Sequence, residues 1–371
     1  MSGQMVKIKK GSVLVYRIFD IAEEIDVAKA ETLLKRIKGP EAFRVPRFID
    51  RGLLVKSKPL AFELGQVDVQ LECGAHRMEV IGKVREFGVL SLVYEIPIKD
   101  GTTWQELVEL AADLEEGSEI DVIAQRMAKE VSERIAEALK KPGTWTVFED
   151  YIIYNFEQFD GDTTAMNLLE RADVPALLLA EDDTVLAPQT REGILEKTYQ
   201  YGEGDLAIVE WNSALVVEDS PSRDVADILE FAVTHLLEMR FYDDLLDKRL
   251  AGLYDDIERS KNSVFRAPFA KVYQDASTRY IEFSEFIERV ENSLKVVGDF
   301  YLATVYRAAT RRFRLPDWQQ NITRKMNMLA QVSSLLQGEV NIRRSHWMEI
   351  TIIALIAFEI ISAMWKLFPI K

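Results

Sequence analysis

The chain has 371 residues, of which 48% are hydrophobic and 29% charged, a composition typical of a folded protein rather than a disordered one. Its formal net charge of −15 argues against nucleic-acid binding, because neutralising phosphates requires a surplus of lysine and arginine. The single cysteine, Cys73, excludes an intramolecular disulfide and suits a reducing compartment. No histidine motif near Cys73 suggests an activated thiolate, so we interpret it as a small packed residue.

The N-terminal stretch MSGQMVKIKKGSVLVYRIF lacks the apolar core and the cleavage site of a signal peptide. It also lacks the arginine- and serine-rich character of a transit peptide. We therefore expect the bulk of the chain to stay in the cytoplasm.

Residues 1–160 alternate strand-like and helix-like runs. The expected elements are a strand at 12–19, a helix at 26–38, strands at 64–72 and 88–98, a helix from 103 that pauses at 116–118 and ends at Pro142, and a strand at 145–156. This β-α-β-β-α-β order predicts an α+β domain of the ferredoxin-like, or split βαβ, type.

Residues 161–222 read as an α/β extension that packs on this domain. Two short helices are expected in VPALLLAED and TREGILEKTYQYG. The run DLAIVEWNSALVVED predicts a pair of strands with the turn at Asn212 and Ser213.

Residues 223–345 change to a heptad period and predict a long coiled-coil region. One apolar seam runs from Val225 to Ile257 and is interrupted only by Asp243; a second runs over 276–308, and a third follows over 322–340. Prolines at 268 and 316 separate the helices. A buried polar residue on a seam can fix the register of a coiled coil, so we expect Asp243 to face Arg279 or Arg289.

The stretch HWMEITIIALIAFEIISAMWKLF, residues 346–368, predicts a C-terminal transmembrane helix that acts as a tail anchor. Trp347 and Trp365 are 18 residues apart, which is about 27 Å along a helix and close to the thickness of a bilayer core. Arg343 and Arg344 stand just before the span, in a segment (303–347) with a local charge of +6, where they can contact anionic headgroups. The alternative is a buried core helix.

Two glutamates interrupt this apolar run. Glu349 falls near the first interface, whereas Glu359 lies about 9 Å inside the hydrocarbon by helical rise, where a charged group costs ~2.5 kcal/mol or more. Thr351, Glu359 and Ser362 fall near one helical face, so a second copy could supply hydrogen-bond partners. We therefore expect the span to self-associate; a single protonated glutamate tolerated near an interface is the alternative.

Three stretches resemble the "required for meiotic nuclear division" family: Asp205–Asp219, His235–Asp247 and, most of all, Asn321–Ile360. In the last, an asparagine- and arginine-containing helix leads into an apolar anchor with a second glutamate, although this chain has Trp347-Met348-Glu349 where the family has leucine-glutamate-tryptophan. The resemblance implies a membrane-anchored homo-oligomer. Its mitochondrial members support organelle translation, a role that a chain without a transit peptide does not simply inherit, and the family offers no catalytic residues to transfer.

Motifs of catalysis, cofactor binding and metal binding are not found in the sequence. The glycines lack the spacing of a phosphate-binding loop. His235 and Glu238 share a helical face near Asp243 and Asp247, but metal sites in helical bundles normally use the order Glu-x-x-His from two helices. We interpret these acids, and the acidic loops elsewhere, as solvated.

Together these observations predict a non-enzymatic, membrane-anchored, homo-oligomeric scaffold or tether that presents an acidic cytoplasmic domain to a protein partner. Residues 1–302 carry a net charge of −21, which provides that acidic surface. The first alternative is an enzyme or small-ligand-binding protein with its site in the N-terminal α+β domain. The second is a multimeric ion- or proton-conducting membrane protein that uses Glu359.

Overall fold

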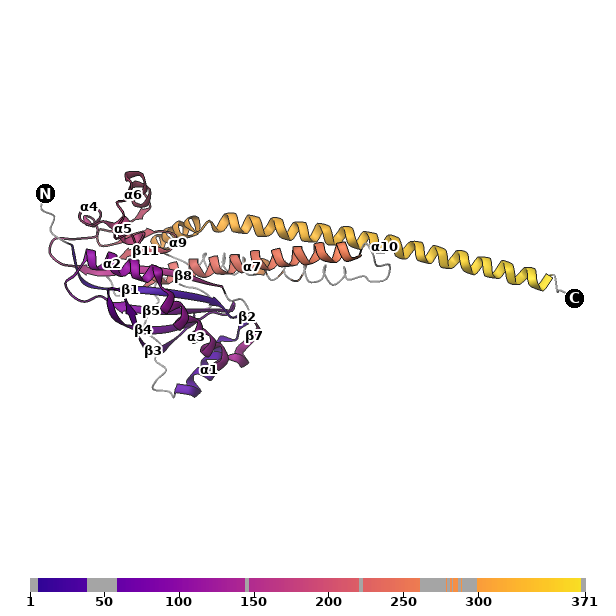
Figure 1. Cartoon of the computed structure of the whole chain (residues 1–371), viewed down its shortest axis with the longest axis horizontal. Helices are drawn as coiled ribbons and strands as arrows, with labels where there is room; N and C mark the ends of the chain where they lie inside the picture. Colours follow the sequence, from indigo (N-terminus) through magenta and orange to yellow (C-terminus); the bar gives the residue numbers. More distant parts are fainter. Residues whose placement is uncertain are drawn as a thin grey trace. The chain divides into compact units, whose positions relative to one another are not determined.

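The structure is a computed structural model of the whole chain, and it describes residues 6–38, 59–143, 147–219, 223–260 and 299–367, together with 278, 281, 283–285 and 288 (Figure 1). The strands are β1 (Lys7–Asp20), β2 (Ala22–Ile25), β3 (Leu60–Leu71), β4 (Gly74–Val84), β5 (Val89–Pro97), β6 (Thr102–Thr103), β7 (Leu139–Pro142), β8 (Phe148–Phe159), β9 (Thr198–Tyr199), β10 (Leu206–Val209) and β11 (Ser213–Val217). The helices are α1 (Val27–Lys38), α2 (Trp104–Glu116), α3 (Ser118–Arg134), α4 (Leu168–Arg171), α5 (Val174–Leu178), α6 (Pro188–Leu195), α7 (Asp224–Ser260), α9 (Phe300–Arg312) and α10 (Leu315–Leu367).

The chain divides into two compact units. Unit 1 comprises residues 1–241 and 286–318, and unit 2 comprises residues 242–285 and 319–371. Helix α7 therefore contributes its first half to unit 1 and its second half to unit 2. A heptad seam and a helix buried in a core have the same apolar spacing, so the apolar positions of α7 suit either unit.

Nine strands of the described part of unit 1 form one mixed sheet in the order β3-β4-β5-β1-β8-β11-β10-β9, with β6 paired to β1. The α+β class is thus confirmed. Strand β1 lies between β5 and β8 and is antiparallel to both, so β5, α2, α3 and β8 make a split βαβ unit around β1.

The strands between residues 60 and 98 differ from the prediction. The sequence predicted two strands between residues 64 and 98, but the chain forms three, because β4 lies between β3 and β5 and pairs antiparallel with both. The first half of β4 carries charged and polar residues, so it shows no apolar run that would mark a strand. Gly74, with φ 138°, allows the tight turn from β3 into β4.

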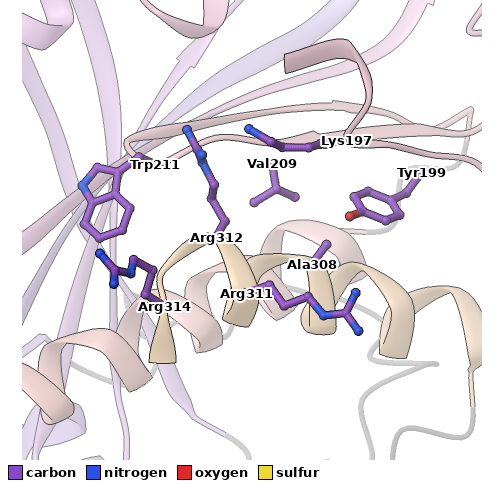
Figure 2. A pocket seen from close by; sticks show the side chains of 8 residues that line it. All are labelled: Lys197, Tyr199, Val209, Trp211, Ala308, Arg311, Arg312 and Arg314. Atoms are coloured by element: carbon purple, nitrogen blue, oxygen red, sulfur yellow. The ribbon is translucent and has the colours of Figure 1, made fainter. Parts of the chain in front are cut away.

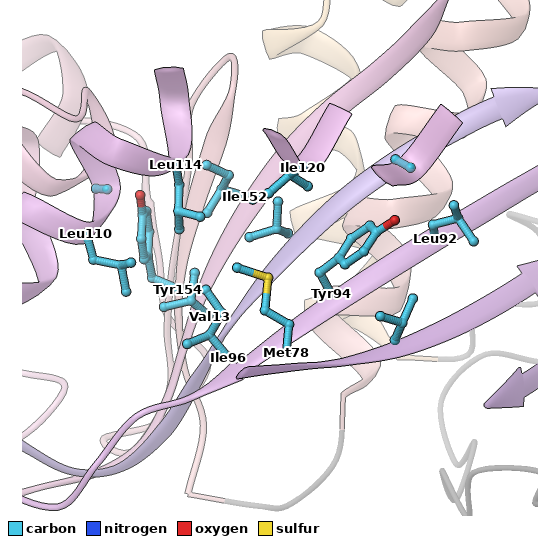
Figure 3. Close-up of a cluster of buried hydrophobic side chains, with 14 of the residues drawn as sticks. Val13, Met78, Leu92, Tyr94, Ile96, Leu110, Leu114, Ile120, Ile152 and Tyr154 are labelled. Atoms are coloured by element: carbon cyan, nitrogen blue, oxygen red, sulfur yellow. The ribbon is translucent and has the colours of Figure 1, made fainter. Parts of the chain in front are cut away.

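The main core lies on the sheet face that α2 and α3 cover (Figure 3). Alternate residues of β1, such as Val13 and Val15, join this core, as the two-residue period of a strand requires. Helix α2 begins with a capping box in which Thr103 and Glu106 satisfy each other's backbone N–H groups. The sequence correctly predicted this helix pair and its interruption at Gly117.

The end of α3 differs from the prediction. The helix stops at Arg134 instead of continuing to Pro142, and residues 139–142 form β7, which pairs antiparallel with β2. Ile135 at the end of α3 is fully buried, and Lys141 adopts φ 46°, so the chain turns here despite its helix-forming residues.

The opposite face of the sheet is covered by the first half of α7, and buried ion pairs hold the two together. Lys83 on β4 donates to Asp227 (2.7 Å) and Glu230 (2.5 Å) of α7, and Arg85 lies 3.7 Å from Glu230. The Glu230 side chain has no exposed surface. Burial alone would raise the pKa of Glu230, but Lys83 and Arg85 outweigh it and hold that pKa below its usual value.

In unit 2 the second half of α7 packs on α10. Leu246 of α7 and, on α10, Ile322, Met326 and Leu329 are buried at positions where the sequence predicted apolar seams. The second predicted seam, over 276–308, lies mostly outside the described residues before Asp299. Helix α10 continues without a break to Leu367, and Ser345–Ser362 is long and apolar enough to cross a membrane.

Candidate functional site

A cavity of about 480 Å³ lies in unit 1 (Figure 2). Its lining combines basic, aromatic and small apolar side chains: Lys197, Tyr199, Val209, Trp211, Ala308, Arg311, Arg312 and Arg314. They come from the segment after α6, from β9 and β10, from the β10–β11 turn, from the last two turns of α9, and from Arg314, the second residue after that helix.

The β10–β11 hairpin forms one wall of this cavity. The N–H of Glu210 donates to the carbonyl of Ser213 (2.8 Å), and the buried Tyr151 hydroxyl lies 3.1 Å from the Glu210 carbonyl and 2.8 Å from that of Ser213. The sequence correctly predicted this hairpin, but its turn lies one residue earlier than expected, at Trp211 and Asn212, because Ser213 already belongs to β11. The turn places Trp211 at the cavity, with 44% of its surface exposed.

The C-terminal end of α9 forms the facing wall. Phe313, which directly follows α9, is fully buried and makes edge-to-face contacts with Tyr151 (5.6 Å between ring centroids) and Trp211 (6.3 Å). Arg311 and Arg312 lie in the last helical turn, where cations interact favourably with the helix dipole. Arg314 adopts φ 55°, which ends the helix and brings its side chain to the cavity.

Glu210 is the acidic partner of this basic cluster. Its carboxylate is 2% exposed and accepts from Lys197 Nζ (3.0 Å) and from the Arg312 guanidinium. Burial, and then the neighbouring Arg312, lowers the pKa of Lys197, and burial lowers the pKa of Arg312. Four cationic side chains line the cavity, and Glu210 pairs with two of them.

Cys73, interpreted from the sequence as a small packed residue, is exposed in the structure and lies beside His76, a contact that no sequence motif indicated. The Cys73 Sγ is 3.4 Å from His76 Nε2, and the Cys73 backbone N–H donates to Asp113 (2.6 Å). Burial and then Asp113 raise the pKa of the Cys73 thiol to about 12. The thiol thus stays protonated at neutral pH, which argues against a nucleophile.

His235, the histidine considered as a metal ligand, lies in the interior of unit 1. Its Nδ1 is 3.1 Å from the Tyr306 hydroxyl, and burial lowers its pKa to about 4. Among the described residues no group of three or more histidine, cysteine, aspartate or glutamate side chains is placed to hold a metal ion.

Asp243, the predicted register residue, forms an ion pair within unit 2. Lys325 of α10 donates to Asp243 (2.7 Å) and to Asp247 (2.6 Å). The two arginines proposed as its partners, at positions 279 and 289, lie outside the described residues. Lys325 belongs to the basic segment over 303–347, and its pairing with Asp243 was not predicted from the sequence.

The predicted anchor residues lie on α10. Trp347 is 53% exposed, Glu349 and Glu359 are exposed, and Ser362 is partly exposed. The Thr351 hydroxyl donates to the Trp347 carbonyl of its own helix (2.8 Å). The side chains at positions 343, 344 and 365 lie outside the described residues.

The basic segment over 303–347 therefore divides in the structure. Arg311, Arg312 and Arg314 of this segment line the cavity of unit 1. The run RRFR, residues 311–314, was visible in the sequence as a dense basic cluster. A count of charges along the chain does not show which surface these side chains line.

The class of this protein is a mixed-sheet α+β unit with a basic cavity and a long helical segment, on which the described residues contain one candidate membrane span. Residues 10–223 match the family described as "Uncharacterized protein MJ0711, N-terminal domain", and the chain belongs to this family. The protein MJ0711 of Methanocaldococcus jannaschii is 22% identical over 262 residues, covering 70% of this chain and 79% of that protein. A solved structure titled "structure of the full-length CmaX protein" is 12% identical, with a TM-score of 0.27, and covers 62% of this chain and 80% of that one.

The family membership shows that the predicted resemblance to the "required for meiotic nuclear division" family was wrong. That resemblance depended mainly on the apolar C-terminal helix with its tryptophan and glutamates. Length, interfacial aromatics and flanking basic residues are what any bilayer requires of a span, so unrelated membrane anchors share them.

Proposed function

We propose that this protein is a single-span membrane protein whose C-terminal part of α10 crosses the bilayer and whose unit 1 remains in the cytoplasm. The observation that carries the proposal is the exposure of large apolar side chains along Ser345–Ser362, such as Ile353 (66%) and Phe358 (71%). A soluble monomer rarely exposes a contiguous apolar surface of this length, and a bilayer is the solvent that favours it.

Length and flanking charges support the same proposal. Trp347 and Trp365 are 18 residues apart, which is about 27 Å along a helix. Arg343 and Arg344 precede the span, whereas Lys366 alone follows it closely. The excess of basic residues on the N-terminal side favours a cytoplasmic location for that side.

Replacing Ile353 and Ile356 together with lysine is expected to release the protein from membranes. Both residues lie near the midpoint of the proposed span, where each lysine opposes insertion by about 2.5–3.5 kcal/mol. The measurement is extraction of isolated membranes with alkaline carbonate, followed by quantification of the protein in the pellet and the supernatant. The unaltered chain should remain in the pellet.

The matched control replaces Val122 and Val185 with lysine, because both are exposed apolar residues of unit 1. This control should leave the protein in the pellet. Release of the unaltered chain by carbonate would contradict the proposed span.

We further propose that the protein is a homo-oligomeric scaffold that presents unit 1, a ferredoxin-like unit enlarged by β4 and the β9–β11 strands, to a protein partner. The packing of α7 on α10 in unit 2 supports a coiled-coil stalk. Glu359 supports association of the spans, since its exposed side chain gains hydrogen-bond partners when a second copy supplies them.

Replacing Glu359 with alanine is expected to weaken self-association of the detergent-solubilised chain by about three- to tenfold, as interhelical hydrogen bonds of polar residues in spans do. The measurement is the native particle mass as a function of protein concentration in detergent. Replacing Glu349 with alanine is the control and should have little effect, because that residue lies at the headgroup boundary. A particle mass that is monomeric for the unaltered chain would exclude this mode of assembly.

A further inference from the structure

The cavity between the β10–β11 hairpin and α9 has a lining that the proposed membrane anchoring does not require. Four of its eight lining residues are basic, in a chain whose net charge is −15. This cluster of cations creates a local positive field in a chain that is acidic overall. Such a field attracts anions.

The cations of the cavity have hydrogen-bonding capacity beyond their internal partners. Arg311 forms neither an ion pair nor a side-chain hydrogen bond with a described residue. Arg312 reaches Glu210, but its Nε is buried and finds no acceptor among the residues described. Buried donors are normally satisfied, so an orphaned one points to a ligand or water that supplies the acceptor.

The other two cations, Arg314 and Lys197, use only part of their hydrogen-bonding capacity for partners within the protein. Arg314 uses its Nε to reach Asp317 (2.8 Å), and its side chain is largely exposed. The Lys197 Nζ is 3.0 Å from the Glu210 carboxylate. In Figure 2 Lys197 lies across the cavity from Ala308 and Arg311 of α9. Arginine guanidinium groups and a lysine ammonium group in one cavity are suited to donate hydrogen bonds to the oxygen atoms of a phosphate group.

Two aromatic rings distinguish this cavity from a simple anion site. Trp211 and Tyr199 lie at its two ends in Figure 2, with Val209 and Arg312 between them. The indole of Trp211 packs edge-on against Phe313, so its position is fixed while almost half of its surface stays exposed. Exposed rings beside guanidinium groups are the surfaces on which nucleic-acid bases stack.

We infer that this cavity binds a nucleoside phosphate, with the phosphate on the arginines and Lys197 and the base against an aromatic ring. The cavity volume of about 480 Å³ is in the range of pockets that bury small ligands. The net negative charge of the chain disfavours a long nucleic acid, whose many phosphates need an extended basic surface, so a mononucleotide fits the local cluster best.

The test is isothermal titration calorimetry of the full chain in detergent micelles with adenosine monophosphate, uridine monophosphate, adenosine and inorganic phosphate. Each nucleotide is expected to bind saturably, adenosine not to bind measurably, and phosphate to bind at least about tenfold more weakly, because it cannot stack. Replacing Arg311 with glutamine is expected to weaken nucleotide binding about tenfold, through loss of a charge-assisted contact.

Three further variants separate binding from folding. Arg307→Gln alters an exposed arginine one turn earlier on α9, away from the cavity lining, and should bind as the unaltered chain does. Trp211→Ala should weaken the nucleotides about fivefold or more while leaving phosphate unchanged, and Trp211→Phe should retain most of the affinity.

Three results would overturn the inference: no saturable binding of either nucleotide, phosphate binding as tight as nucleotide binding, or unchanged nucleotide affinity in Arg311→Gln. Because Arg311 is exposed and has no described side-chain partner, its variant is expected to fold, as its melting temperature will show. The site lies entirely in unit 1, so none of these results depends on the proposed span.

Discussion

Replacing Lys83 with methionine is expected to lower the free energy of unfolding of unit 1 by about 3–5 kcal/mol, the loss typical of removing one partner of a buried ion pair. Lys83 is 2.5 Å from the carboxylate of Glu230, which has no exposed surface, and 2.7 Å from that of Asp227. The variant leaves Glu230 with the more distant Arg85 at 3.7 Å, so a buried negative charge is left poorly compensated.

Urea titration of the full chain in detergent, followed by tryptophan fluorescence, measures this loss. Lys9→Met is the matched control, because Lys9 is an exposed lysine on β1, and its effect should stay within about 0.5 kcal/mol. The double variant Lys83→Met with Glu230→Leu removes both charges and is expected to recover most of the lost stability. Equal stability of Lys83→Met and the unaltered chain would show that these charges do not hold α7 on the sheet.

This ion-pair network also shows where sequence patterns stop being informative. The apolar positions of α7 correctly indicated a long helix, and the same positions, such as Leu229 and Leu236, are buried in unit 1. A heptad seam does not specify which structural element packs against it. The pairing of Lys83 with Glu230 spans 147 residues, and such contacts arise from strand order, which periodicity does not determine.

Elements with a strong single period were predictable. The split βαβ unit around β1, the α2–α3 pair with its interruption at Gly117, and the β10–β11 hairpin all follow local patterns of two or of 3.6 residues. Strand β4 was missed because its first half is polar, and β7 was missed because its residues favour a helix. In both cases pairing with a neighbouring strand decides the conformation.

The cavity could be predicted only in part. The run from Arg311 to Arg314 was visible as a basic cluster, whereas Lys197 and Trp211 carry no motif. They reach the cavity because β9, β10 and the hairpin turn lie beside α9, which follows about a hundred residues later in the chain. A functional site of this kind depends on topology, so its residues become recognisable only when the elements are placed together.

The melting temperature of unit 1 is expected to fall as the pH rises from 6.5 to 8. Burial, together with nearby acidic residues, raises the pKa of Glu218 to about 8. Burial also raises the pKa of Asp20 and that of Glu149 to about 7; for Glu149, Arg240 at 2.5 Å opposes the effect of burial without overcoming it. These groups hold protons in the folded state that the unfolded chain, with carboxyl pKa values near 4, has already lost.

The sign follows from proton linkage. A raised carboxyl pKa contributes stability that is complete below about pH 4 and is lost as the pH rises to the folded pKa, here 7 to 8. His235 acts oppositely, since its pKa of about 4 in the fold removes stability as the pH falls below about 6.5. Between pH 6.5 and 8 the carboxyl groups therefore dominate, with an expected loss of about 2–3 kcal/mol at ~1.4 kcal/mol per group and pH unit.

Thermal unfolding of the full chain at constant ionic strength, at pH 6.5 and 8, measures this dependence. Glu218→Gln replaces the protonated acid with a neutral amide of similar shape, so the variant should be more stable than the unaltered chain at pH 8 and should lose at least half of the pH dependence. Glu203→Gln, an exposed glutamate of the same region, should change neither. A melting temperature that rises or stays constant from pH 6.5 to 8 would mean that Glu218, whose buried Oε2 finds no hydrogen-bond partner among the described residues, is ionised in the fold.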